Sequence, residues 1–175
     1  MKITGKVWRF GANVNTDLIF PNRYFKPKYA PGEMGSHVMS GADPDFPSKV
    51  RPGDVIVGSR NFGCGSSREE AAGSLREAGI GALLAPSFGR IFMRNCIGLG
   101  VPAIPCAGID EHASEGDDIE IDLSAGRLRN LTNGYETAIA PLAPELLKLL
   151  TDGGLQEYTS RELARRRAAQ SPATH

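Results

Sequence analysis

Three consecutive polar residues, Ser66, Ser67 and Arg68, combine two hydroxyls with a guanidinium in one short segment. Such a group could bind an anion, because arginine captures a carboxylate through two parallel hydrogen bonds. Gly63 and Gly65, just upstream, tolerate backbone angles that other residues avoid and let a ligand approach the main chain. A serine beside positive charge can also act as a base, since that charge stabilises its alkoxide. The segment predicts an anion site with a candidate base.

The same segment has a purely structural interpretation. Ser66 with Glu69, and Ser67 with Glu70, match two overlapping S-x-x-E capping boxes. In that case the serines only accept hydrogen bonds from the first helical turn. Both interpretations predict a helix N-terminus here, with free N–H groups and the positive end of the helix dipole.

Asp17 and Arg23 are further candidates, from a different part of the chain. Asp17 ends the segment Asn15-Thr16-Asp17, which is typical of a tight Asx turn but could equally bring a carboxylate to the site of Arg68. Arg23 opens a stretch rich in proline and glycine, residues 22–52, which predicts a long loop. Its cations and aromatics could form a lid over an anionic substrate or a solvated loop. We expect His37, in the same loop, at the surface rather than as a ligand.

The elements that would position these residues follow from apolar runs and glycine or proline breaks. Strands are predicted at 2–10, 54–57, 80–85 and 101–104, and helices at 67–78 and 88–99. Ile91, Phe92, Cys96 and Leu99 would share the buried face of the second helix. Strands alternating with helices predict right-handed crossovers and a parallel core.

The remainder of the chain changes character and predicts an antiparallel part. Alternating segments at 117–123, 127–131 and 135–139 are separated by turn residues, and a short helix is expected at 144–150. A basic helix should follow at 161–167, with a frayed end at 168–175. We therefore predict an α/β protein with one domain at 1–159 and a basic C-terminal tail at 160–175.

Composition argues against several classes of function. The chain has 175 residues, with 20 Lys+Arg against 20 Asp+Glu, so neither a nucleic-acid partner nor a membrane surface is expected. The cysteines, at positions 64, 96 and 106, form no C-x-x-C pair, which predicts reduced thiols in the cytoplasm and no metal site of their own. A full dinucleotide fingerprint, a P-loop and a G-x-S-x-G elbow are all missing.

Four blocks of the sequence carry a resemblance to a known family. Residues 63–69 are similar to the Gly-x-Gly-Ser-Ser-Arg-Glu signature of the swivel domain of the aconitase superfamily. Residues 5–21, 53–57 and 86–95 resemble, in order and at similar separation, the small subunits of the 3-isopropylmalate dehydratase family. The resemblance implies a three-layer β/β/α swivel domain with a parallel βαβ core and an antiparallel C-terminal part.

The resemblance also implies a reaction and a division of labour. The family consists of hydro-lyases that interconvert 2-isopropylmalate and 3-isopropylmalate, a step of leucine biosynthesis, by dehydration and rehydration. Ser66 would be the catalytic base, and Ser67, Arg68, Asp17 and Arg23 would bind a 2-hydroxy di- or tricarboxylate. A [4Fe–4S] cluster would be carried by a separate large subunit, so this chain would be inactive alone and would act in a heterodimer.

Three alternatives stay open at this stage. The loop at residues 22–27 does not choose among isopropyl, homocitrate-type and methyl-substituted malates, so a related dehydratase is possible. A non-catalytic anion-binding module is a second alternative, although the joint presence of Ser66, Ser67 and Arg68 argues against it. A free-standing enzyme without a cluster is the third.

Overall fold

The computed structural model describes residues 1–170. The strands are β1 (Lys2–Arg9), β2 (Val55–Val57), β3 (Ala82–Ala85), β4 (Ala103–Pro105), β5 (Asp118–Asp122), β6 (Arg127–Asn130) and β7 (Glu136–Ala138). The helices are α1 (Thr16–Ile19), α2 (Phe46–Lys49), α3 (Glu69–Glu77), α4 (Arg90–Gly98), α5 (Ile109–His112), α6 (Pro144–Asp152) and α7 (Leu155–Gln170). Two 3₁₀ turns, η1 (Asn22–Tyr24) and η2 (Gly35–His37), lie in the long loop.

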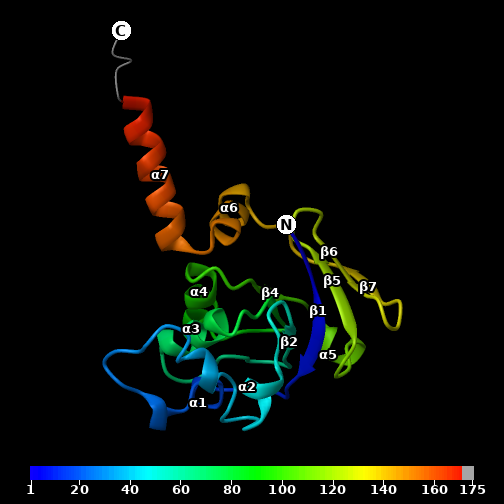
Figure 1. The fold of residues 1–175 in the computed structure, drawn as a ribbon. Helices are drawn as coiled ribbons and strands as arrows, with labels where there is room; N and C mark the ends of the chain where they lie inside the picture. Colours follow the sequence, from blue (N-terminus) through cyan, green and yellow to red (C-terminus); the bar gives the residue numbers. More distant parts are fainter. Residues whose placement is uncertain (171–175) are drawn as a thin grey trace.

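All seven strands join one curled sheet in the order β4-β3-β2-β1-β5-β6-β7 (Figure 1). Strand β1 is the junction between its two halves. It pairs in parallel with β2, Val7 lying opposite Val55, and antiparallel with β5, Ile3 lying opposite Ile121. Strands β2, β3 and β4 continue in parallel, while β5, β6 and β7 form an antiparallel meander. The predicted α/β class, with its parallel and antiparallel parts, is confirmed.

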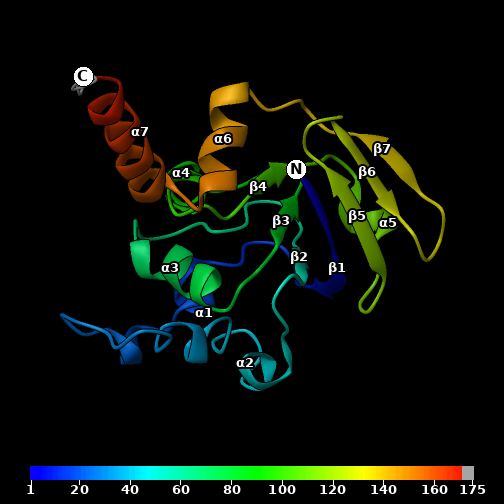
Figure 2. The same cartoon turned by 45° about the horizontal axis from the view of Figure 1, so that its top comes forward.

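Two apolar cores separate three layers because neighbouring residues of each parallel strand point to opposite faces. Ile56 and Leu83 face the helices and pack with Leu75 of α3. Val55 and Leu84 face the other way. They pack in the second core with residues of the antiparallel strands, which include Ile119, Ile121 and Leu128. The sheet therefore curls back over itself, with helices α3 and α4 on its outer side (Figure 2).

The long loop at 22–52 is anchored at several points rather than solvated throughout. Val38, Met39 and Phe46 are fully buried within it. The Met39 N–H donates to the Ile19 carbonyl at 2.6 Å, which ties the loop to α1. The N–H of Gly35 donates to Glu77 Oε2 at 3.1 Å, which ties it to α3. The loop thus spans the region between two elements that carry candidate site residues.

Two predicted details of the helices are wrong. Helix α3 begins at Glu69 rather than at residue 67, because Arg68 is still extended at φ −110° and ψ 119°. Ile91 is 51% exposed, although Phe92 and Cys96 are buried as expected. Helix α4 begins at Arg90, so Ile91 lies in its first turn, beyond the apolar layer that covers Phe92.

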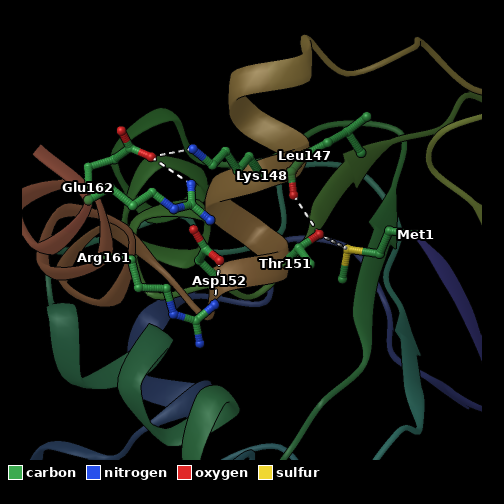
Figure 3. Close-up of polar contacts among 8 residues, drawn as sticks. Met1, Leu147, Lys148, Thr151, Asp152, Arg161 and Glu162 are labelled. Atoms are coloured by element: carbon green, nitrogen blue, oxygen red, sulfur yellow. Dashed lines mark hydrogen bonds and ion pairs between the residues drawn. The ribbon is translucent and has the colours of Figure 1, made fainter. Parts of the chain in front are cut away.

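Ion pairs attach helix α7 to the rest of the protein. Lys148 and Asp152 of α6 pair with Glu162 and Arg161 of α7, and Figure 3 shows these contacts. Arg76 of α3 also pairs with α7, through Glu157. Leu155 and Leu163 on α7 remain 55% and 49% exposed, so apolar packing contributes little to its attachment.

The helix is longer than its sequence predicts. It begins at Leu155 and runs through the expected boundary between residues 159 and 160. That division into a domain and a tail stays a prediction. The expected frayed end at 168–175 is helical as far as residue 170, and its last five residues lie outside the described part of the chain.

Candidate functional site

Three loops meet at the carboxyl ends of the parallel strands, where α/β sheets commonly bind ligands. They follow β1, β2 and β3. The N–H of Gly63 donates to the Val14 carbonyl at 2.7 Å, and the Thr16 N–H donates to the Cys64 carbonyl at 2.9 Å. The N–H of Gly89 donates to the Phe62 carbonyl at 2.8 Å. The main chains of the three loops therefore form one hydrogen-bonded platform beneath the serine segment.

Glycine is required where these loops cross. Gly63 has φ +73°, and a Cβ built on it would lie 2.0 Å from Phe92 Cδ1. A Cβ on Gly89 would lie 2.3 Å from the Gly63 carbonyl oxygen. Real Cβ atoms do not approach other atoms so closely. The backbones at Gly63 and Gly89 therefore cross in close contact, with the Phe92 ring packed against Gly63. This contact fixes the position of the main chain just before the serine segment.

The two serines do not cap helix α3, so the capping-box interpretation is wrong. The N-cap is Arg68, and no side chain makes a capping hydrogen bond there. Gly65 at φ +94° turns the chain so that Ser66 and Ser67 precede the N-cap, and both are exposed. Neither hydroxyl has a hydrogen-bond partner within residues 1–170. The serines and the first N–H groups of α3 are therefore available to a ligand.

Ser66 lines a cleft of about 330 Å³ between the glycine segment and the start of α4. Cys64, Arg90 and Ile91 contribute to its walls. This cleft is formed by the platform loops, so its shape depends on the contacts described above. A hydroxyl on such a wall can reach a bound molecule without breaking any bond to the protein.

Arg68 and Asp17 form an ion pair beside the serines. Arg68 Nη1 lies 3.0 Å from Asp17 Oδ1, and the two side chains are 23% and 56% exposed. Asp17 Oδ1 also accepts the Asn22 N–H at 2.8 Å. This backbone hydrogen bond, followed by the one from Arg68, lowers the pKa of Asp17 below its ordinary value. The structure brings the two predicted residues together, and the carboxylate holds the guanidinium next to Ser67.

A second cleft, of about 430 Å³, lies on the other side of the serine segment. Asn22 and Phe25 form one wall, and the segment 67–70, which includes Glu69 and Glu70, forms the other. Arg23 is exposed, its guanidinium lies 4.9 Å from the centre of the Tyr24 ring, and its charge also lowers the pKa of Asp17. The 22–25 turn, which carries Arg23, thus adjoins the anion site.

Several contacts of this site were not predicted from the sequence, although the turn at Asn15 was. The main-chain N–H of Asn22 orients Asp17, and Asn15 caps α1 by accepting hydrogen bonds from the N–H groups of residues 17 and 18. Phe25 and Arg90 line the two clefts. The Asx-turn signal indicated the role of Asn15. Nothing in the sequence predicts which backbone N–H meets Asp17, because that contact depends on how the loop folds back.

The thiols do not suit an iron–sulfur cluster. Cys96 and Cys106 are buried on opposite faces of the sheet, Cys96 in the helix-side core and Cys106 in the core between the strand layers. Burial raises the pKa of both thiols, which opposes the thiolate form that a cluster needs. Cys64 is partly exposed and lines the first cleft. Within residues 1–170, no group of three His, Cys, Asp or Glu side chains is placed to hold a metal ion.

A membrane span is also missing from the described residues, since none of their helices is both long and apolar enough to cross a bilayer. The three-layer fold, with two exposed serines followed by a partly buried arginine at the carboxyl edge of its parallel strands, has the features of a swivel domain of the aconitase type. A family model for the aconitase C-terminal domain matches residues 12–107. That range contains all three loops of the platform.

Relatives and a solved structure extend the match to nearly the whole chain. The isopropylmalate/citramalate isomerase small subunit of Methanocaldococcus jannaschii is 49% identical over 93% of this chain and 96% of its own. The 3-isopropylmalate dehydratase small subunit of Thermodesulfovibrio yellowstonii is 46% identical, and the match covers 94% of this chain and 97% of that protein. The methanogen homoaconitase small subunit of Methanothermobacter thermautotrophicus is 52% identical, with 89% of each chain covered.

The crystal structure of 3-isopropylmalate dehydratase (leuD) from Methanocaldococcus jannaschii superposes with a TM-score of 0.86 at 38% identity. The match covers 96% of this chain and 99% of that one. The chain therefore belongs to the aconitase superfamily, in the family of 3-isopropylmalate dehydratase small subunits.

Proposed function

We propose that the chain is the small subunit of an iron–sulfur hydro-lyase that interconverts 2-isopropylmalate and 3-isopropylmalate. The observation that carries this proposal is the uncapped serine segment beside the Arg68–Asp17 pair, in a chain whose relatives are dehydratase small subunits. The anion site suits a substrate carboxylate, because the guanidinium, the serine hydroxyls and the first N–H groups of α3 all donate there.

Each residue of the site has a role in this reaction. Ser66 acts as its alkoxide, which takes the proton from the substrate carbon during dehydration and becomes the hydroxyl, and the hydroxyl returns the proton during hydration. Ser67 donates a hydrogen bond to the substrate, and Arg68 holds a carboxylate while Asp17 keeps the guanidinium in place. Arg23, on the η1 turn, adds positive charge at the second cleft.

The iron–sulfur cluster belongs, in this proposal, to a large partner subunit. The thiols of this chain do not fit as its ligands, since two of the three are buried on different faces of the sheet. A bound cluster of this kind supplies a Lewis acid for the departing hydroxyl. The chain is therefore expected to act only with the large subunit. Its cytoplasmic location and its lack of nucleic-acid partners remain predictions.

The nature of the side group on the substrate is the open choice within this class. Relatives named for isopropylmalate, citramalate and homoaconitase differ little in identity to this chain. The second cleft offers Phe25, which is 55% exposed and suits an isopropyl group, and a single cation in its lining, Arg68, beside the carboxylates of Glu69 and Glu70. Isopropylmalate is the first substrate to test, and homocitrate-type and methyl-substituted malates are the alternatives.

The test is reconstitution with the cluster-bearing subunit encoded by the same organism. The two chains should co-purify under anaerobic conditions and hydrate 2-isopropylmaleate, measured by loss of alkene absorbance. Conversion of a different alkene diacid only would keep the mechanism and change the substrate. Turnover by the isolated chain in the presence of an iron chelator, or the lack of any complex with that subunit, would overturn the proposal.

A further inference from the structure

The η1 turn is held in place by few contacts, although it forms a wall of the anion site. None of its three residues is buried, and its own hydrogen bonds are those from Tyr24 N–H to the Pro21 carbonyl and from Phe25 N–H to the Asn22 carbonyl. The position of the turn nevertheless matters, because its Asn22 N–H donates to Asp17. Tyr24 supplies further support through two rings outside the turn, Phe20 with ring centres 6.3 Å apart and His37.

The ring of His37 makes the closer of these two contacts. It stacks on Tyr24 with the ring centres 3.8 Å apart and the planes 6° apart. Phe20 packs edge-on against the imidazole, with the ring centres 6.4 Å apart. Tyr24 thus presents its ring to His37 while the Arg23 guanidinium also lies over that ring.

His37 itself belongs to a fixed part of the protein. Its turn, η2, receives support from α3 through the Gly35 N–H bond to Glu77, and a Cβ on Gly35 would lie 2.9 Å from the Glu77 carbonyl carbon. The backbone carbonyl of His37 accepts a hydrogen bond from the Ser40 hydroxyl at 2.7 Å, and Ser40 is buried. The stack therefore connects η1 to α3, the helix whose N-terminus carries the serine segment.

We propose that His37 is a positioning residue, whose imidazole stacks on Tyr24 and holds the η1 turn so that Arg23 and the Asn22 N–H stay at the Asp17–Arg68 anion site. This inference rests on the proposed function for its effect on substrate binding. The role requires a flat ring rather than a charge or a proton, so phenylalanine can replace the imidazole.

The chain contains a matched control for this stack. His112 stacks on Tyr135 with ring centres 4.0 Å apart and planes 12° apart, in α5 and the 131–135 turn. That pair lies on the antiparallel side of the protein, away from the platform loops. Removing either imidazole deletes the same kind of aromatic contact. A difference in KM or in cleavage rate between the two variants is therefore due to where the stack lies in the protein.

The first experiment measures KM and kcat of the assembled complex. In His37→Ala, KM should rise about three- to tenfold with kcat within twofold, as loss of one aromatic pair predicts. His37→Phe should restore KM, and His112→Ala should leave it unchanged. An unchanged KM in His37→Ala, no rescue by phenylalanine, or an equal KM shift in His112→Ala would each overturn the proposal.

The second experiment does not depend on the reaction. Trypsin cleavage after Lys28, which follows η1, should be several-fold faster in the full-length His37→Ala chain than in the wild type. His37→Phe and His112→Ala should be cleaved there at the wild-type rate. If the wild-type complex converts no diacid, the proposed function fails, and equal cleavage of the wild type and His37→Ala would then overturn the role of His37 separately.

Discussion

Ser66 is the residue on which the proposed chemistry depends most directly. It is exposed, lines a cleft and has no hydrogen-bond partner within residues 1–170, so its replacement should not disturb the fold. In the assembled complex, Ser66→Ala should lower kcat by about 10²- to 10⁴-fold, the usual contribution of a general base. Ser67→Ala removes the hydroxyl of the neighbouring serine and should mainly raise KM. Near-normal turnover in Ser66→Ala would exclude it as the base.

Asp17 gives a prediction that depends on pH. Its pKa is lowered by the Asn22 N–H and by Arg68, so the folded protein favours the carboxylate. A lowered folded pKa contributes stability above the unfolded value of 3.8, and that contribution is lost as pH falls through the folded value. The unfolding midpoint of Asp17→Asn should therefore lie below that of the wild type at pH 7. The gap should close below pH 3.8, and a gap that stays constant would contradict this assignment.

For single residues, the sequence predicted which side chains belong to the candidate site better than it predicted the contacts that these side chains make. The joint occurrence of Ser66, Ser67 and Arg68 indicated an anion site, and the structure places Asp17 beside it. The role of the serines at the helix start was not predictable from S-x-x-E spacing, because Gly65 at φ +94° delays the helix until residue 69. His37 carried no signal, since stacking depends on a loop conformation that short-range patterns do not encode.

The crossing of the glycine loops is the feature of the elements that most affects the site. Gly63→Ala would place a methyl group 2.0 Å from the Phe92 ring at φ +73°. We expect a loss of about 1–2 kcal/mol from the left-handed backbone and roughly 1–3 kcal/mol more from overpacking. Activity should fall with stability, because the serine segment rests on this crossing.

Gly108 is the matched control for that substitution. It has the same φ of +73°, and nothing lies within 4 Å of a Cβ built on it. Gly108→Ala should therefore lose only the backbone part, about 1–2 kcal/mol, with activity retained. Urea unfolding of the two variants measures the difference. Equal losses would show that contact with Phe92 does not matter.

The regular elements were largely predictable, because apolar runs of strand or helix length carry a strong signal. The antiparallel strands β5, β6 and β7 alternate along their length, and each falls within its predicted range. The short helices α1, α2 and α5 and the two 3₁₀ turns were not predicted. Each has only three or four residues, so long-range contacts such as the Met39 hydrogen bond to Ile19 decide their position rather than local propensity.

At the scale of the whole molecule, helix α7 should respond to salt differently from the domain it joins. Its links to α3 and α6 include ion pairs with partly exposed cations, of which the Arg161 pair has a carboxylate, Asp152, that is only 9% exposed. Lys148 also lies over the Tyr158 ring. Exposed pairs contribute about 0–1 kcal/mol each and are screened over about 3 Å at 1 M salt. Raising sodium chloride from about 0.1 M to about 1 M should accelerate amide exchange in α7.

Helix α3, with buried Ala71, Ala72 and Leu75, is the internal reference, and its exchange should change little. Arg161→Gln should reproduce part of the salt effect on α7 at low salt, since it removes the pair with Asp152. Salt-independent exchange in α7 would mean that packing rather than charge holds this helix.

The junction role of β1 has a consequence for synthesis of the chain. Strand β1 is made before either of its neighbours, and it pairs with β2 some fifty residues later but with β5 only at residues 118–122. At ribosomal rates of about 5–20 residues per second, one edge of β1 stays open for on the order of ten seconds. An unpaired edge can join a strand of another chain. Nascent-chain aggregation should therefore end only once the β5 segment has emerged.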